Sequence, residues 1–144
     1  MNIKLETKVK APFPKVKKAF VNKDGNLLKF LLPMFSKLLH YKGIRRGALL
    51  KIKIPFTGGL CFKIVTYNTS KEKLYFNDIL YEGSMFGAKF WSHRHSIIKQ
   101  TNHTLIKDDI TFTTKNALKD KLLHAIIYPY FLLRVLKYKL YFWR

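Results

Sequence analysis

Cysteine is almost absent from this sequence, and Cys61 is its single representative. A lone cysteine excludes an internal disulfide and any cysteine-rich metal site. Long apolar runs are also missing: the longest apolar segment, residues 125–133, is interrupted by Pro129 and is shorter than the roughly 18 residues of a membrane span. The N-terminus alternates in charge and has no apolar signal-peptide segment, so we expect a cytoplasmic protein.

Acidic residues are scarce, with 8 against 28 lysines and arginines, which gives a formal net charge of +20. Such a charge favours a polyanionic partner: nucleic acid, an anionic membrane surface or an acidic ligand. The basic residues are spread along the whole chain, however, and codon bias also produces a lysine-rich composition. We therefore weigh compositional bias above a dedicated polyanion site. No basic cluster belongs to a recognisable nucleic-acid module, so nucleic acid is not an expected partner.

Two catalytic motifs are also lacking. No Gly-x-Ser-x-Gly sequence exists, so a serine nucleophile on a strand-to-helix turn has no support. The pair Gly58-Gly59 is not followed by the Lys-Ser/Thr of a phosphate-binding loop, so nucleotide binding has no support either.

Apolar residues make up 48% of the chain, enough for one domain with a real core over residues 1–144. Alternation of apolar and polar residues predicts a first strand at 3–9 and later strands at 49–54, 60–67, 73–81, 86–99 and 104–114. Two short helices are predicted after the first strand, at about 14–20 and 27–32, with a further helical turn at 34–39. Strands that follow one another through short turns indicate an antiparallel meander.

Three of these strands carry polar side chains on their apolar faces. The faces are Leu74, Phe76, Asp78 and Leu80; Trp91, His93, His95 and Ile97; and Thr104, Ile106, Asp108, Ile110 and Phe112. Polar groups on the inner face of a sheet are costly unless they are paired. The stretch from Leu74 to Phe112 therefore predicts an interior that is partly a cavity lined with polar groups.

A long helix is predicted from Asn116, a plausible N-cap, to about Leu140. Its apolar residues at spacings of three and four form a stripe that we expect the sheet to bury. The stripe consists of Leu118, Leu122, Ile126, Tyr130, Leu133 and Leu136, widened by Leu123, Ile127 and Leu140.

Several of these segments together resemble the START-like (SRPBCC) superfamily, which includes a plant pollen-allergen group and a polyketide cyclase/dehydrase group. They are Val9-Lys-Ala-Pro12 before a helix, the Pro33 segment, Phe76-Asn-Asp78, Gly83, Trp91-Ser-His-Arg-His95 and Thr104-Leu-Ile-Lys-Asp108. The last four resemble a bacterial ligand-binding subgroup. The resemblance implies an α+β helix-grip fold, in which a curved antiparallel sheet of about seven strands grips the long C-terminal helix over a hydrophobic cavity.

The chemistry-bearing candidates are His93 and His95, which share one strand face, together with Asp78 and Asp108. Our leading interpretation is that these groups satisfy one another by hydrogen bonds. Contact with the polar end of a ligand comes second. Metal binding comes third, since a lone His-x-His is a weak signal, and we predict neither a metal nor a cofactor. No catalytic residue is assigned; the candidates are His93, His95 and Asp108.

The resemblance implies binding or carrying a small hydrophobic or amphipathic molecule, lipid-like or polyketide-like, and in some members cyclisation or dehydration. For this chain we favour binding over catalysis and leave enzymatic activity open. The predicted ligand-binding residues are Phe76, Asp78, Trp91, His93, His95, Asp108, Phe112, Ile126 and Tyr130. Two alternatives stay open. One is a cyclase or dehydratase that uses an Asp–His pair; the other is a basic protein that binds an anionic membrane or nucleic acid. The basic and aromatic residues at 137–144 would suit a membrane surface.

Overall fold

The computed structural model describes residues 1–143, which form seven strands and three helices. The elements are β1 (Asn2–Val9), α1 (Phe13–Val21), α2 (Asn26–Leu31), β2 (Lys37–His40), β3 (Leu49–Ile54), β4 (Gly58–Thr69), β5 (Lys73–Glu82), β6 (Phe90–Lys99), β7 (Thr104–Thr113) and α3 (Ala117–Tyr141). This order confirms the predicted succession of a strand, short helices, a run of strands and a long helix.

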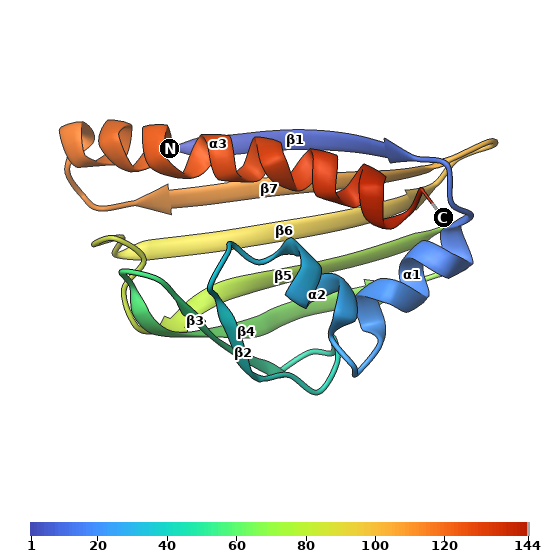
Figure 1. Cartoon of the computed structure of the whole chain (residues 1–144), viewed down its shortest axis with the longest axis horizontal. Coiled ribbons are helices and arrows are strands. Elements are labelled where there is room, and N and C mark those ends of the chain that lie inside the picture. The colour runs from blue at the N-terminus through green and yellow to red at the C-terminus, as the bar shows by residue number, and fades with distance from the viewer. Residues whose placement is uncertain (144) are drawn as a thin grey trace.

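The seven strands form one antiparallel sheet in the order β1-β7-β6-β5-β4-β3-β2. Every neighbouring pair except β1 and β7 is consecutive in the chain, because short turns join successive strands. Figure 1 shows α3 running along β1 and β7. The helices α1 and α2 cover the same face of the sheet, over the strands toward β4 and β5. The sheet therefore grips the long helix, which confirms the predicted helix-grip fold.

Two predicted boundaries were wrong. Residues 34–39 do not form a helical turn: residues 37–40 are the edge strand β2, in which Leu38 pairs with Ile52 of β3. The strand expected from residue 86 begins instead at Phe90. Phe86 and Gly87 both adopt positive φ, a turn conformation that an extended strand cannot contain.

The predicted strand faces are confirmed, and the core that they build has two parts. One apolar cluster gathers around α1 and the end of α3, with Val16, Phe20 and Tyr138 among its members. The other gathers around the first turns of α3, with Trp91 and Phe131 among its members. The polar side chains of β5, β6 and β7 lie between these two clusters.

The predicted buried stripe of α3 was wrong for six of its nine residues: Leu118, Leu122, Ile126, Leu133, Leu136 and Leu140 point outward and are 50–68% exposed. Leu123 and Ile127 are buried as predicted, and the sheet also buries Phe131, Arg134 and Tyr138. The helix has apolar residues on two faces, so periodicity alone does not say which face packs on the sheet. The two polar residues on this buried face are Arg134 and Tyr138. They lie beside the polar side chains of the sheet.

The ends and contacts of α3 hold it in place. Asn116 caps the helix as predicted, since its side chain accepts a hydrogen bond from the Lys119 backbone N–H at 3.0 Å. The Tyr130 hydroxyl and the Lys137 ammonium donate to carbonyl groups at the end of α2, those of Leu31 and Leu32. These bonds tie α2 to α3 over the cavity.

Among the described residues, no helix has the length and apolar character needed to cross a bilayer. The basic and aromatic stretch at 137–144 belongs to α3 up to Tyr141, and Arg144 lies outside the described residues.

Candidate functional site

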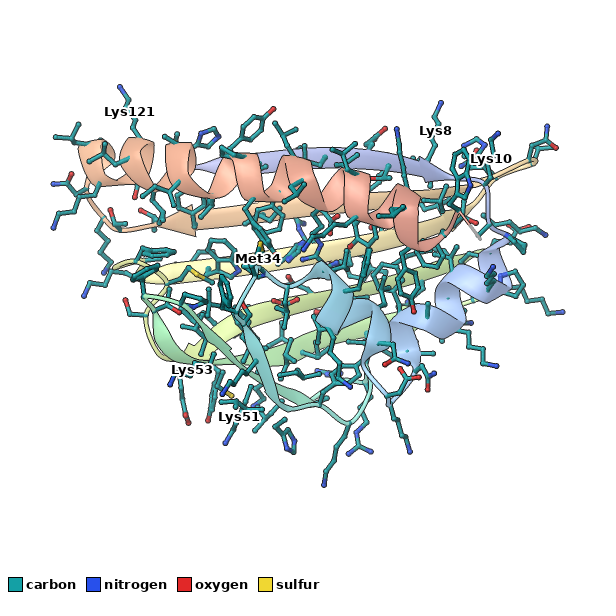
Figure 2. The ribbon with its side chains drawn as sticks, in the orientation of Figure 1. Lys8, Lys10, Met34, Lys51, Lys53 and Lys121 are labelled. Atoms are coloured by element: carbon teal, nitrogen blue, oxygen red, sulfur yellow. The ribbon has the colours of Figure 1, made fainter. Side chains whose placement is uncertain are left out.

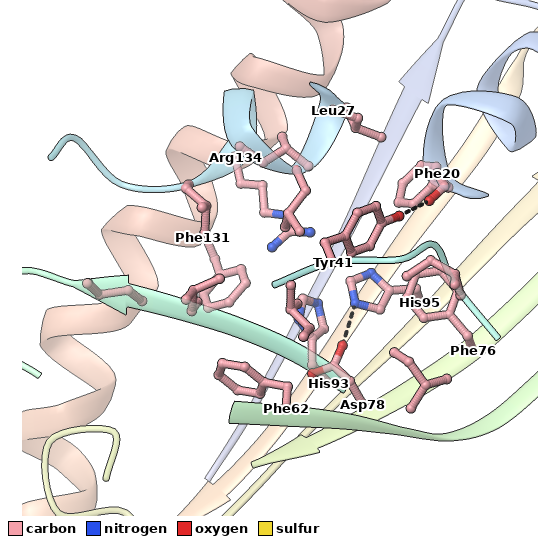
Figure 3. A pocket seen from close by; sticks show the side chains of 18 of the residues that line it. Phe20, Leu27, Tyr41, Phe62, Phe76, Asp78, His93, His95, Phe131 and Arg134 are labelled. Atoms are coloured by element: carbon pink, nitrogen blue, oxygen red, sulfur yellow. Dashed lines mark hydrogen bonds and ion pairs between the residues drawn. The ribbon is translucent and has the colours of Figure 1, made fainter. Parts of the chain in front are cut away.

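A cavity of about 110 Å³ lies between the inner face of the sheet and all three helices. Most of its wall is apolar, contributed by leucines and isoleucines of α2 and β3 and by aromatic residues of α1, β5, β6 and α3. The polar groups in the wall are Tyr41, Asp78, His93, His95, Tyr130 and Arg134. Figure 3 shows the guanidinium of Arg134 reaching into this space from α3, opposite the two histidines.

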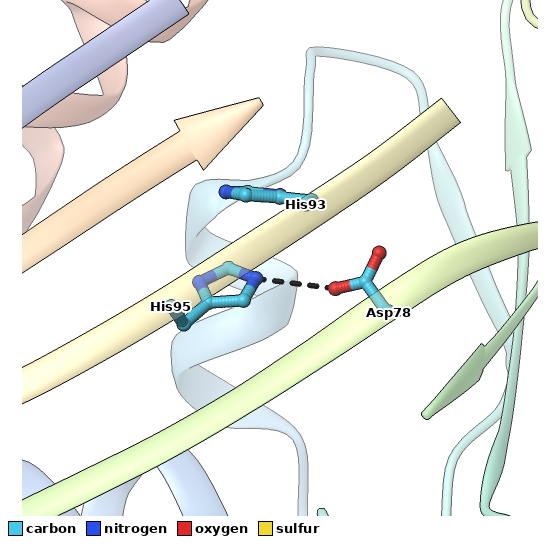
Figure 4. Close-up of side chains that lie close together, drawn as sticks. All are labelled: Asp78, His93 and His95. Carbon is cyan, nitrogen blue, oxygen red and sulfur yellow. Dashed lines mark hydrogen bonds and ion pairs between the residues drawn. The ribbon is translucent and has the colours of Figure 1, made fainter. Parts of the chain in front are cut away.

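Three adjacent strands bring the acidic and imidazole groups together. In register, Asp78 of β5 faces His93 of β6, and Asp108 of β7 faces His95. His95 Nε2 lies 3.1 Å from Asp78 Oδ2 (Figure 4), and His93 Nε2 lies 2.9 Å from Asp108 Oδ1. His95 Nδ1 is 3.0 Å from that same Asp108 oxygen, close enough for an ion pair although poorly angled for a hydrogen bond. His95 therefore lies between two carboxylates.

Aromatic rings enclose these imidazoles on both sides. Phe76 stacks on His95 with ring centroids 4.3 Å apart, and Phe131 meets His93 edge-on at 5.3 Å. The two imidazoles lie 3.7 Å apart. His93, His95 and Asp108 are all buried. Because water is largely excluded here, charge interactions within the cluster are strong.

Arg134 brings a positive charge to the cluster. Its side chain is buried, and its Nε donates to the Tyr138 hydroxyl at 3.1 Å. Burial by itself would raise the pKa of Asp108, but the charge of Arg134 and the two imidazole contacts hold it well below its ordinary value. Asp108 is therefore ionised.

The two histidines hold protons to different degrees. Burial by itself would lower the pKa of His95, but hydrogen bonds and charge from Asp108 and Asp78 outweigh it and raise this pKa. Burial and the neighbouring charge of His95 lower the pKa of His93 to about 4. The cluster thus favours a protonated His95 beside a neutral His93. The positive charges of His95 and Arg134 then balance the two carboxylates.

Six of the nine predicted ligand-binding residues line the cavity: Phe76, Asp78, Trp91, His93, His95 and Tyr130. Asp108 is outside the lining and contacts both histidines. Phe112 is buried and stacks on Trp91 with centroids 5.8 Å apart. Ile126 is 58% exposed on the outer face of α3, so the structure does not place it at the cavity.

The sequence prediction missed the cavity residues outside the central strands, above all Arg134, Phe20 and Tyr41. No local pattern in the sequence selects Arg134, because its role follows from charge balance once helix and sheet are packed together. Two buried carboxylates and one protonated histidine leave one negative charge uncompensated, and buried charges are rarely left unpaired. Arg134 is the basic residue that shares a helix face with Leu123, Ile127 and Phe131.

A metal ion would find its donors in Asp78, His93 and His95, whose ligand atoms all lie within 4.8 Å of one another. Two features oppose such use. His95 would have to lose the proton that two carboxylates hold on it. The ion would also lie near the buried cation of Arg134. The arrangement suits a pair of hydrogen-bonding imidazoles better than a metal centre.

Comparison of the sequence with protein families and with curated proteins gives no match. The fold, in contrast, is similar to that of many solved structures. Norcoclaurine synthase from Thalictrum flavum, in complex with dopamine and hydroxybenzaldehyde, is 14% identical, with a TM-score of 0.66 over 94% of this chain and 83% of that one. Ara h 8.0201 is 17% identical, with a TM-score of 0.66 over 98% and 96%.

An uncharacterized protein from Bacillus thuringiensis is similar over its full length, with 14% identity and a TM-score of 0.73. These neighbours share the helix-grip fold of this chain, which is the fold that the sequence motifs predicted. Structural similarity at such low sequence identity establishes the fold of the chain but not its activity, which has to be argued from the site.

Proposed function

We propose that residues 1–144 act as one ligand-binding domain that holds a small apolar or amphipathic molecule in the cavity. The observation that carries this proposal is an apolar cavity with a charge-balanced polar cluster in its wall. Burial of apolar ligand surface would supply most of the affinity, and a few convergent polar groups would orient the ligand.

The size of the cavity limits the ligand. Its volume, about 110 Å³, is below the roughly 300–1,000 Å³ of pockets for drug-sized ligands. A cavity of about 150 Å³ lined by apolar residues can hold benzene. A single ring therefore matches this cavity best, and a larger lipid-like or polyketide-like molecule would require α2 to move away from α3.

The electrostatics of the cluster predict the polar end of the ligand. Asp78 and Asp108 are already balanced by His95 and Arg134. A charged ligand group would add an uncompensated buried charge, which is costly. A neutral hydroxyl or carbonyl, which can exchange hydrogen bonds with the imidazoles, is the group that we expect.

Filling the cavity should abolish binding. Ala19 lines it from α1, whereas Ala125 is exposed on the outer face of α3. We expect Ala19→Phe to weaken binding of phenol at least about tenfold, because the new ring occupies the ligand volume. Ala125→Phe adds the same ring outside and should bind phenol as the parent protein does. Calorimetric titration measures both, and equal affinities of the two variants would contradict the proposal.

The natural ligand is identified separately. Native mass spectrometry of the protein from its own host, followed by extraction, would reveal a co-purifying molecule. Its loss in Ala19→Phe and retention in Ala125→Phe would assign it to the cavity.

A second candidate function is acid–base catalysis of the cyclase or dehydratase type. It is favoured by one observation: the environment pushes the pKa values of His93 and His95 apart, as in sites that separate an acid from a base. His95 would then exchange its contact with Asp78 for one to a substrate oxygen and donate a proton there, and turnover should fall as pH rises through its raised pKa. We expect His95→Gln to remove this dependence while His103→Gln, at an exterior turn, keeps it. Turnover with an unchanged pH profile in His95→Gln would exclude this role.

A further inference from the structure

The outer face of α3 is unusually apolar for a surface helix. Between Leu122 and Leu136 every exposed position carries an apolar side chain, a proline or a tyrosine. These positions are Leu122, Ala125, Ile126, Tyr128, Pro129, Leu132, Leu133 and Leu136, and we call them the outer α3 face. Their spacing of three and four keeps them on one side for most of the helix length. Contiguous exposed apolar surface of this kind marks an interaction site.

Lysines border the outer α3 face on both sides. Lys119 and Lys137 are 18 residues apart, as are Lys121 and Lys139, so each pair points in one direction at about 3.6 residues per turn. The first pair follows one edge of the apolar face and the second pair follows the other. The one acidic residue of α3, Asp120, is engaged by Thr113 and Thr114. The borders of the face are therefore basic.

The apolar surface continues from α3 onto the end of α2. The ring of Phe30 lies 5.4 Å from that of Tyr141, and Lys137 donates to Leu32 at 2.9 Å. Beyond this junction, Met34 projects from the segment that follows α2 (Figure 2), and its neighbour Phe35 is 86% exposed. Phe35 also has a φ of 64°, a strained conformation for a bulky residue. A large apolar side chain held exposed at a conformational cost supports an external partner for this surface.

We propose that the outer α3 face, with Met34 and Phe35, docks on the surface of an anionic lipid membrane. An apolar face bordered by lysines suits the bilayer interface, where the apolar residues enter the acyl boundary and the ammonium groups of Lys119, Lys121 and Lys139 reach the lipid phosphates, while that of Lys137 stays bonded to Leu32. A second copy of this chain is the poorer occupant, because each copy has a net charge of +20 and the same lysines would meet across the contact. The helix would lie in the plane of the interface.

This docking would place the cavity beside the membrane. The cavity is lined by Leu27, Leu28 and Leu31 of α2 and by Tyr130 and Phe131 of α3. The exposed surface belongs to α3 and to the segment directly after α2. A molecule of low water solubility could then pass between bilayer and cavity without crossing water. The docking itself does not depend on cavity binding.

Vesicle co-sedimentation tests the proposal with the full chain. Vesicles of equal parts phosphatidylglycerol and phosphatidylcholine should bind the protein, and vesicles of phosphatidylcholine alone should bind it much more weakly. We expect Leu133→Gln/Leu136→Gln, two exposed positions, to lower the affinity at least about tenfold by removing apolar surface. Circular dichroism and phenol binding should be unchanged in this variant, so a failure of docking is distinguishable from a failure of the cavity proposal.

Two charge-matched variants separate a directed contact from general attraction. Lys121→Gln/Lys139→Gln removes two charges beside the outer α3 face, and Lys51→Gln/Lys53→Gln removes two from the distant strand β3 (Figure 2). A lysine near an anionic bilayer is worth roughly fivefold in affinity, so the first variant should bind at least about tenfold more weakly than the second. Equal binding by the two, or full binding by Leu133→Gln/Leu136→Gln, would overturn the proposal. A dimer in sedimentation that Leu133→Gln/Leu136→Gln dissolves would instead assign this face to self-association.

Discussion

Arg134→Met should lower the free energy of unfolding by about 3–5 kcal/mol, the usual cost of leaving a buried charge without its partner. Arg134 and Asp108 are 9% and 3% exposed. Methionine keeps much of the length and apolar contact of the arginine but none of its charge. Asp78 and Asp108 would then share His95 alone as their counter-charge. Urea unfolding monitored by circular dichroism measures the change.

Arg94→Met is the matched control. Arg94 also pairs with an aspartate of β7, Asp109, at 3.2 Å, but on the outer face of the sheet, where the two side chains are 51% and 23% exposed. Exposed pairs contribute about 0–1 kcal/mol. The double variant Arg134→Met/Asp108→Asn should recover part of the loss, because it removes one orphaned carboxylate. Equal costs for Arg134→Met and Arg94→Met would refute the charge balance inferred for the site.

Acidification from pH 6.5 to about pH 4 should destabilise the protein, and His93 should account for roughly 3 kcal/mol of that loss. Burial and the charge of His95 lower the pKa of His93 from 6.5 to about 4. Between these two values the unfolded chain binds a proton at this residue and the folded chain does not. Protons therefore favour unfolding in this window, and stability falls as the pH falls.

Two neighbours titrate outside that window. His95 has a raised pKa, so its stabilising contribution is complete below its ordinary value and is lost as the pH rises through the raised one. Asp108 has a lowered pKa, so its contribution is present above the ordinary value of 3.8 and is lost only as the pH falls further. Arg134 stays charged throughout.

His93→Gln provides the measurement, since glutamine retains a hydrogen-bonding group near the position of Nε2 but does not titrate. Urea unfolding at a series of pH values should show a flatter stability profile between pH 6.5 and pH 4 for this variant. His103→Gln, in the turn between β6 and β7, removes a histidine outside the cluster and should leave the slope of the parent protein. A slope that survives in His93→Gln would show that His93 is not the source of the acid sensitivity.

The strands and their buried faces followed from the sequence because the side-chain period of a strand is two. Trp91, His93 and His95 were assigned to one face, and all three are buried there. The boundaries were less predictable. β2 depends on pairing with β3, a tertiary contact that local residues do not specify.

The long helix was predictable as an element, from its spacing and its Asn116 cap, but not in its rotation about its own axis. Its fully apolar stripe, which includes Leu133 and Leu136, is exposed, and the stripe that packs on the sheet contains Arg134. A prediction that the most apolar face of the helix packs on the sheet therefore selects the wrong face of α3. The carboxylates on the sheet require a cation opposite them, and this requirement exists only once sheet and helix are brought together.

The sequence by itself therefore determined the order of elements, the faces of the strands and the presence of polar groups at Asp78, His93, His95 and Asp108 within an apolar interior, because these depend on periodicity within single elements. Only the tertiary structure decided that Arg134 completes this cluster, that Ile126 is away from the cavity, and that an apolar face of α3 is exposed. These outcomes depend on the balance of charge and packing between elements distant in the chain, which no local pattern records.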